Sequence, residues 1–378
     1  MIFIKKLFTN ILLILVFSLI NYLSELSLKY IKYSKGKKYI DKCLNFSFIK
    51  NYNYSNESPS LSVVIPAFNC EKKILFPILS IQNQNLTNFE IILINDFSQD
   101  NTYNMIYQLR KKDKRIKIIN NKKNMGTLYS RCIGTLMSKG EYIFPLDNDD
   151  MIFGEDIFDF TYKLAKNNKY DILGFKSVFS HRYSENIRNM KDLYKYIYPN
   201  NLIVCQPKLS TWIITINGKF TPHDVTLWAK IINSKIYIQA INLLGKNRYS
   251  KYVSWAEDTS MIFIIFNIAY SYIFVHKYGI LHLSSSSSAT TTQPFNNNFF
   301  GLVFWLEVIF DFSQKNYNKN YSVSAALYIM KNYSKNKSKI NKANLSYLKN
   351  IIYKIIKSKY IQNDNKILLI KRLKKFCS

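Results

Sequence analysis

Between residues 61 and 146, short apolar segments alternate with segments of helical periodicity. The apolar segments are rich in β-branched and aromatic residues and are typical of buried strands: Leu61–Pro66, Phe89–Asn95, Arg115–Asn120 and Tyr142–Leu146. The segments between them, at 71–84, 101–112 and 126–138, have the spacing of helices. Strands that are apolar on both faces and alternate with helices form a parallel sheet covered by helices on each side. The sequence therefore predicts an α/β fold with a mostly parallel sheet.

Polar clusters follow three of these strands, namely Ala67–Asn69, Asp96–Asp100 and Asp147–Asp150. In open α/β sheets, ligands bind beyond the carboxyl ends of the strands. The chain has neither the dehydrogenase pattern G-x-G-x-x-G nor the P-loop pattern G-x-x-x-x-G-K-[ST]. If this edge binds a nucleotide, we expect its phosphates to be held through a metal.

The third cluster, P-L-D-N-D-D at 145–150, places three carboxylates in four positions of a chain with 53 Lys and Arg against 24 Asp and Glu. Carboxylates this close repel one another unless a cation or hydrogen-bond donors compensate them. Two readings are open at this point: a metal site, or an N-cap for a helix that begins at Ile152.

The formal charge of +29 favours anionic partners, although Lys, Asn and Ile share A/T-rich codons and their abundance weakens that argument. No zinc-finger spacing or RNA-binding signature is present, so we predict no nucleic-acid partner. The five Cys are scattered without a C-x-x-C pair, which excludes a cysteine zinc site and leaves the redox compartment open.

The N-terminus contains an uncharged run from Leu7 to Ser24. Eighteen residues of helix span about 27 Å, close to the thickness of a bilayer core. No cleavage site follows, so we predict a single-pass signal anchor over 1–24 and a polar stem over 25–58. Lysines after the run favour a cytosolic body, whereas eight N-x-[ST] sequons permit a luminal one. We expect an endomembrane location of the ER or Golgi type, with the side left open.

Four stretches in order resemble the family 2 glycosyltransferases, which have the GT-A fold. LSVVIPAFN (61–69) is similar to their opening strand and turn, and ILINDFSQDNT (91–102) to their V-D-D-G-S-x-D-x-T segment, with Asn95 and Phe97 in place of Asp and Gly. NMGTLYSRCIG (124–134) resembles their N-x-G-x-x-x-A-R-N segment, with Ser130 and Cys132 as departures, and PLDNDD is similar to their L-D-x-D-D metal motif.

The resemblance implies a nucleotide-sugar donor, with a UDP-linked sugar favoured, and Mn²⁺ or Mg²⁺ bound to its diphosphate. Asp149 would be a metal ligand, Asp147 would contact the metal or the ribose, and Asp150 would support the cluster. The implied donor-binding residues are Pro66, Ala67, Asn69, Asp96, Asp100, Arg131 and Asp147. For Arg131 a surface position is the alternative.

The second half resembles the acceptor side of the same family. VTLWAKIINSKIYIQAI (225–241) would bring Trp228 and Lys230 to the acceptor, unless they are core and surface residues. SWAEDTSM (254–261) is similar to the E-D segment, which implies Asp258 as catalytic base with Glu257 beside it. Asp258 as N-cap of an apolar helix over 259–275 is the alternative.

GILHLSSSSSATTT (279–292) resembles a late segment that closes over the diphosphate, so His282 would bind the metal or a phosphate, unless it is structural. The uncharged run 259–276 is expected to be a buried helix rather than a second membrane span. Apolar residues from Phe299 to Phe312, interrupted by Glu307, predict core or interface packing. Lysine-rich residues from 340 onward predict an amphipathic helix, either solvated or lying on anionic lipid.

The predicted domains are the donor-binding half (59–155), the acceptor-binding half with the base (156–295) and a helical, basic C-terminal extension (296–378). The predicted function is a membrane-anchored inverting transferase that moves a hexose or N-acetylhexosamine onto a glycan, glycoprotein or lipid. Two alternatives stay open: a catalytically inactive GT-A-like binding protein, and a cytosol-facing polyprenyl-phosphate glycosyltransferase.

Overall fold

The computed structural model describes residues 57–179, 202–205, 226–282, 294–315 and 321–377. The chain divides into two compact units, Met1–Tyr52 and Asn53–Ser378, and every described residue belongs to the second. The predicted anchor and stem, apart from the stem's last two residues, lie outside the described residues. Among the residues that are described, none of the helices has both the length and the apolar character needed to cross a bilayer.

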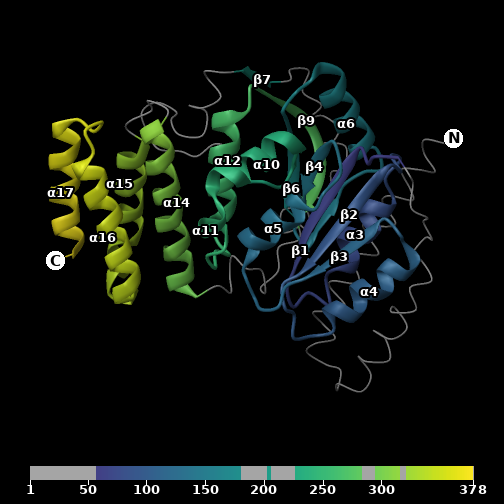
Figure 1. Cartoon of the computed structure of the whole chain (residues 1–378), viewed down its shortest axis with the longest axis horizontal. Coiled ribbons are helices and arrows are strands. Elements are labelled where there is room, and N and C mark those ends of the chain that lie inside the picture. Colours follow the sequence, from purple (N-terminus) through teal and green to yellow (C-terminus); the bar gives the residue numbers. More distant parts are fainter. Residues whose placement is uncertain (1–56, 180–201, 206–225, 283–293, 316–320, 378) are drawn as a thin grey trace, which may run out of the picture. The chain divides into compact units, whose positions relative to one another are not determined.

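The first half of the fold is a parallel sheet, as predicted (Figure 1). Its strands lie in the order β3-β2-β1-β4, and all three pairings between them are parallel. Because the strands run the same way, their carboxyl ends meet at one edge of the sheet. The elements are β1 (Leu61–Ala67), α3 (Leu75–Gln82), β2 (Phe89–Asn95), α4 (Thr102–Lys112), β3 (Ile116–Asn120), α5 (Thr127–Leu136) and β4 (Tyr142–Pro145).

The second half of the sheet is mixed, so the prediction of a mostly parallel sheet holds only for the first half. The order continues from β4 through β8, β6 and β9 to β5, with β7 on the side of β9. Only β6 and β9 pair in parallel here, whereas β8 is antiparallel to both β4 and β6, and β9 is antiparallel to β5 and β7. The strands are β5 (Asp150–Ile152), β6 (Ile172–Phe179), β7 (Leu202–Cys205), β8 (Lys230–Asn233) and β9 (Ser271–His282).

Alternating side chains of the central strands fill two cores. Val64, Ile92 and Ile143 point to the side of α5 and belong to one large apolar cluster that continues through the C-terminal helices. Phe144, the residue after Ile143, points to the opposite face and packs on Phe158, with ring centroids 5.2 Å apart. This period of two is the expected result of the strand pleat. The helices that complete the two layers are α6 (Ile157–Asn168), α10 (Ser234–Leu244) and α11 (Lys246–Tyr249).

The uncharged run 259–276 forms two elements, so the prediction of one helix over 259–275 is wrong. Helix α12 (Glu257–Ile268) ends before a short turn, and β9 begins at Ser271. Tyr272 to Val275 are β-branched or aromatic and pair with β6, where their side chains pack well on a pleated surface. The expectation that this run is buried rather than membrane-spanning is confirmed, because the α12 residues from Met261 to Phe266 are buried in the core.

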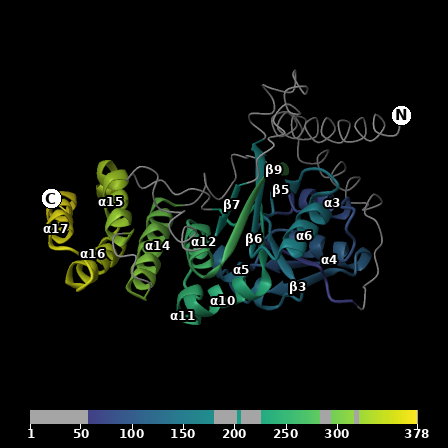
Figure 2. The same ribbon diagram turned by 90° about the horizontal axis from the view of Figure 1, so that it is seen from above.

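The C-terminal extension is helical, and its helices succeed one another outward from the sheet (Figure 2). Helix α14 packs on α12, α15 and α16 pack on α14, and α17 packs on α15 and α16. Trp305 and Phe299 of α14 are fully buried, so the predicted core packing of 299–312 is confirmed. The elements are α14 (Phe295–Lys315), α15 (Tyr321–Tyr333), the 3-10 helix η2 (Ser334–Lys339), α16 (Lys342–Lys357) and α17 (Asn363–Cys377).

Candidate active site

The loops that follow β1, β2 and β4 contact one another at the carboxyl edge of the sheet, as the sequence predicted. The side-chain oxygen of Asn69 accepts a hydrogen bond from the backbone N–H of Gln99 (2.8 Å), which joins the first two loops. The side-chain amide of Asn148 donates to the carbonyl oxygen of Pro66 (2.9 Å), which joins the loop after β4 to the end of β1. The backbone N–H of Asp96 donates to the carbonyl oxygen of Ala67 (2.8 Å). The predicted donor-binding residues of these loops therefore surround one edge.

Asp96 organises the start of α5 from the end of β2. One carboxylate oxygen accepts from the backbone N–H of Met125 (2.8 Å) and the side chain of Asn121 (2.7 Å), and the other accepts from the N–H of Gly126 (2.8 Å). A carboxylate at a helix N-terminus is favoured by the unpaired N–H groups and by the helix dipole. Asp96 is only 4% exposed. A direct contact with a nucleotide base stays a prediction for this residue.

Asp100 has a similar local role at the start of α4. Its carboxylate accepts from the backbone N–H groups of Thr102 (3.0 Å) and Glu71 (3.2 Å). Phe97, which stands where the family has Gly, adopts a φ of 63° and is 46% exposed. A left-handed backbone costs free energy for a residue with a side chain. Phe97 adopts it nevertheless, so the turn after β2 has the backbone conformation that a glycine would favour.

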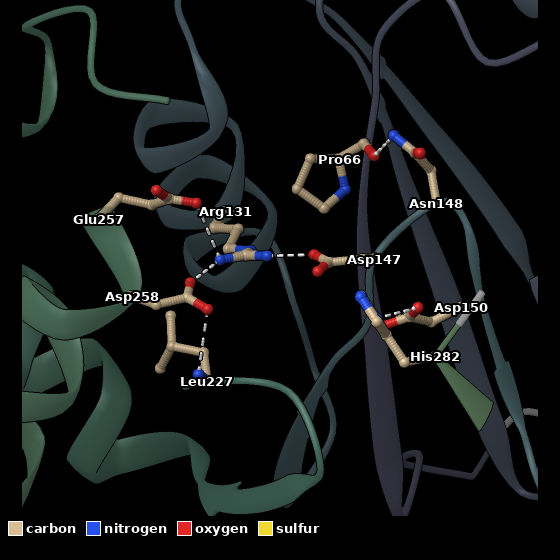
Figure 3. Close-up of polar contacts among 9 residues, drawn as sticks. All are labelled: Pro66, Arg131, Asp147, Asn148, Asp150, Leu227, Glu257, Asp258 and His282. Atoms are coloured by element: carbon tan, nitrogen blue, oxygen red, sulfur yellow. Dashed lines mark hydrogen bonds and ion pairs between the residues drawn. The ribbon is translucent and has the colours of Figure 1, made fainter. Parts of the chain in front are cut away.

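Arg131 connects the two halves of the site (Figure 3). It lies on α5 and is 3% exposed, so the surface alternative is wrong. One terminal nitrogen of its guanidinium binds Glu257 (3.2 Å) and Asp258, and the other binds Asp147. Asp147 belongs to the acidic cluster after β4, whereas Glu257 and Asp258 begin α12. Three carboxylates from opposite sides of the site thus converge on one buried cation.

Glu257 and Asp258 differ in their access to solvent. Burial raises the pKa of Glu257 although Arg131 opposes the shift. The side chain of Asp258 is 19% exposed against 9% for that of Glu257. The carboxylate oxygen of Asp258 that does not contact Arg131 accepts a hydrogen bond from the backbone N–H of Leu227 (3.3 Å). Asp258 lies in the first turn of α12 after Ala256, which has a φ of 58° and caps the helix without a side-chain bond. The alternative of Asp258 as N-cap is therefore wrong.

Each carboxylate of the acidic cluster pairs with a different basic residue. Asp147 pairs with Arg131, Asp149 with Lys73 (3.4 Å), and Asp150 with Nδ1 of His282 (2.7 Å). Residues 150–152 form β5 and the next helix begins only at Ile157, so the N-cap reading of the cluster is wrong. Sequence reasoning missed Lys73, although a lysine pair directly after the first polar loop was a signal for it.

Asp150 and His282 face each other because their strands pair at that register. Burial raises the pKa of Asp150. Burial lowers the pKa of His282, but the contact with Asp150 and the charges of Asp150, Asp147 and Asp149 together raise it above its ordinary value. The ring of Trp228 stacks on His282, with centroids 5.7 Å apart and planes 10° apart. Lys230 is 1% exposed, which excludes a surface position, and its ammonium donates to the carbonyl of Thr226 (2.6 Å).

The acidic cluster has the chemistry of a site for a hard divalent cation. Burial, and after it the charge of Asp147, raises the pKa of Asp149, which means that its charge is incompletely compensated. Oδ2 of Asp150 is buried and no described residue hydrogen-bonds to it. Carboxylate oxygens are the ligands that Mg²⁺ and Mn²⁺ prefer. Within the described ranges, no group of three or more His, Cys, Asp or Glu side chains is arranged so that it could hold a metal ion.

Comparison with known proteins finds a family that matches part of this chain. Residues 62–215 match the family model described as "Glycosyl transferase family 2". Residues 62–215 therefore carry a family 2 glycosyltransferase domain. An uncharacterized glycosyltransferase of Haemophilus influenzae is 40% identical over 116 residues, which are 31% of this chain and 36% of that protein.

Two further relatives have named activities. The Staphylococcus aureus poly(ribitol-phosphate) beta-N-acetylglucosaminyltransferase TarP is 36% identical over 118 residues, 30% of this chain and 35% of TarP. The Campylobacter jejuni GalNAc(5)-diNAcBac-PP-undecaprenol beta-1,3-glucosyltransferase is 38% identical over 93 residues, 24% of this chain and 30% of the relative. The matches thus span about a third of the length of these relatives.

Solved structures show the same fold over a longer stretch. The crystal structure of S. aureus TarS 1-349 in complex with UDP-GlcNAc aligns with a TM-score of 0.55 at 16% sequence identity. The alignment covers 84% of this chain and 88% of that one. The GT-A-like fold predicted from the four motifs is therefore confirmed.

Proposed function

We propose that the chain is an inverting glycosyltransferase that moves a hexose or N-acetylhexosamine from a UDP-linked donor to a hydroxyl of a glycan, glycoprotein or lipid. One observation carries the proposal. Arg131 joins Asp147 of the acidic cluster to Asp258 at the start of α12, so a phosphate-side carboxylate and a candidate base border one site. Transfer from a sugar diphosphate requires both functions in the same place.

The donor half supports a nucleotide at the loops after β1 and β2. The turn from Pro66 to Asn69 and the carboxylates of Asp96 and Asp100 are fixed by hydrogen bonds between these loops and to α4 and α5. A site that is already held in place by its own hydrogen bonds needs little reordering when a ligand binds. The TarS structures in complex with UDP and UDP-GlcNAc favour a UDP-linked donor for this fold.

A Mn²⁺ or Mg²⁺ ion would be held by Asp149, with Asp147, Asp150 and His282 around it. When bound, such an ion neutralises the charge that develops on the leaving diphosphate. Lys73 would then exchange its contact with Asp149 for a phosphate oxygen. Asp150 and His282, whose strands fix their positions, would support the cluster rather than move with it.

In the transfer step Asp258 acts as the general base. Its carboxylate accepts the proton of the acceptor hydroxyl while that oxygen bonds to the anomeric carbon, and the bond from this carbon to the diphosphate breaks. Attack from the face opposite the leaving group inverts the anomeric configuration. Arg131 positions Asp258 and Glu257, and the deeper burial of Glu257 makes it the companion rather than the base.

The half-buried ring of Trp228, stacked on His282, is a platform for an acceptor sugar beside the acidic cluster. Lys230 would support the loop before β8 from within, through Thr226, rather than contact the acceptor. The two named relatives act on a poly(ribitol-phosphate) and an undecaprenol-linked glycan, and both acceptor classes are included in the proposal. The uncharged run Leu7–Ser24 would hold the protein at a membrane.

A donor screen with Mn²⁺ tests the proposal by measuring the release of nucleoside diphosphate. We expect wild type to release UDP from a UDP-sugar, and Asp149→Ala and Asp258→Ala to lose at least a hundredfold in rate. Asp159→Ala is the matched control, because Asp159 lies on α6 and pairs only with exposed Lys163 in the described structure. Wild type that binds UDP-sugars but releases no UDP would replace the proposal with the inactive binding protein.

A further inference from the structure

The excess of basic residues is unevenly distributed over the chain. Residues 57–179, which form the donor half, contain 16 Lys and Arg against 14 Asp and Glu. Residues 321–377, which form α15 to α17, contain 14 Lys and Arg against a single acidic residue, Asp364. A codon bias toward lysine acts on the whole gene and does not explain this contrast. The C-terminal helices therefore carry a local positive field.

Helix α17 has one buried face and one exposed face. Leu369, Leu373 and Phe376 are buried against α15 and α16. On the remaining surface Ile367 is 63% exposed and Ile370 is 39% exposed. Within the described part of the chain, nothing covers this face. In Figure 2, α17 is the helix furthest from the sheet.

The exposed isoleucines and the lysines share the same surface. Ile367, Ile370, Lys371 and Lys374 follow the i, i+3, i+4, i+7 spacing that places them on one side of a helix. Leu368, at 37% exposure, and exposed Lys375 border this stripe. Apolar side chains ringed by lysines are the arrangement by which a surface helix enters the boundary between headgroups and acyl chains.

We propose that the exposed face of α17, formed by Ile367, Leu368, Ile370, Lys371, Lys374 and Lys375, docks on an anionic lipid surface. The lysines are attracted to the negative headgroups, and the isoleucines enter the acyl boundary beneath them. A soluble polyanion would satisfy the lysines equally but would leave the isoleucines in water. The apolar exposure therefore favours lipid over an anionic polymer.

Spin labelling of α17 on vesicles tests the proposal in the full chain. The label is placed at Ile367→Cys after replacement of Cys43, Cys205 and Cys377 by Ser. Vesicles of phosphatidylcholine alone are compared with vesicles that contain about 30% phosphatidylglycerol. We expect the accessibility of the label to oxygen, relative to a water-soluble nickel complex, to rise several-fold on the anionic vesicles only. A membrane anchor at the N-terminus would act on both vesicles and would not produce that difference.

Charge variants separate this surface from general attraction. Lys371→Gln, Lys374→Gln and Lys375→Gln together should weaken the lipid-dependent signal about a hundredfold, since each lysine near the headgroups contributes about a fivefold factor. The matched control removes three exposed charges near α4, by Arg110→Gln, Lys111→Gln and Lys114→Gln, and should leave the signal unchanged.

Two results would overturn the proposal. A label whose oxygen accessibility does not change on anionic vesicles shows that α17 stays out of the bilayer. A label immobilised by soluble polyphosphate but not moved to depth by vesicles assigns the surface to an anionic polymer instead.

Discussion

Replacing Arg131 by Met is the sharpest perturbation of the site, because it removes the cation that three carboxylates share. Met has a similar length and keeps the buried volume filled. Glu257 and Arg131 are both nearly inaccessible, at 7% and 3% exposure. Removing one partner of a buried ion pair costs about 3–5 kcal/mol, since the other charge is left uncompensated. We expect the free energy of unfolding to fall by that amount at pH 8.

The loss should depend on pH in a direction that the structure determines. The pKa of Glu257 is already raised by burial, and without Arg131 it will rise further. A carboxyl whose folded pKa is raised destabilises the protein at pH values above its ordinary pKa, and protonation removes that penalty. The difference between Arg131→Met and wild type should therefore shrink as the pH falls from 8 toward 5, by up to about 1.4 kcal/mol per pH unit for each group that takes up a proton.

Denaturant unfolding of both proteins at several pH values measures this difference. Glu257→Gln in the Arg131→Met background should recover part of the stability, because it removes one uncompensated charge. Arg248→Met is the matched control: Arg248 pairs with Asp311 at the surface, where such a pair contributes on the order of 0–1 kcal/mol. A penalty for Arg131→Met below about 1 kcal/mol, or one that is the same at pH 5 and pH 8, would refute the reasoning.

Three further predictions concern the surroundings of the site. An ideal Cβ on Gly301 of α14 would clash with the carbonyl oxygen of Trp255, so Gly301→Ala should displace the loop before Asp258 and lower the free energy of unfolding by about 1–3 kcal/mol. The turnover of sugar donor should fall as well, and an unchanged turnover would contradict this prediction. Because the pKa of Asp149 is raised, the Mn²⁺ concentration for half-maximal activity should increase as the pH falls toward that raised value. A concentration that stays constant from pH 8 down to the lowest pH at which the protein stays folded would contradict this. Phe97→Gly should raise the free energy of unfolding by up to about 1 kcal/mol, since glycine adopts a φ of 63° without strain, and a loss of stability in denaturant would count against it.

The first half of the fold was predictable because its strands are short, apolar on both faces and ended by polar residues. The run after Asp258 was not, since no charge or proline marks the turn between α12 and β9. Periodicity could not separate a buried helix from a buried strand in that continuous apolar sequence. The antiparallel pairings of β8 also escaped prediction, because a strand of four residues carries no signal for its direction.

The residues of the site could be predicted from the sequence, but the contacts between them could not. The motifs pointed to the acidic cluster, Asp258 and Arg131, and the structure brings these residues together. Sequence alone could not show that Arg131 binds carboxylates 16 and 127 positions away, since such contacts depend on the packing of α5 against α12. Lys73 escaped for the same reason: its partner Asp149 is distant in sequence and meets it only at the edge of the sheet.

The central claim is that carboxylates from two halves of the chain surround one metal–diphosphate site. A crystal of the protein grown with UDP and Mn²⁺, with anomalous data collected at the manganese edge, tests it most directly. We predict one strong manganese peak within bonding distance of Asp149 and beside the phosphates of UDP, with Arg131 and Asp258 on the acceptor side. Bound UDP whose phosphates lie away from residues 147–150, or a manganese peak at some other group of residues, would contradict the account.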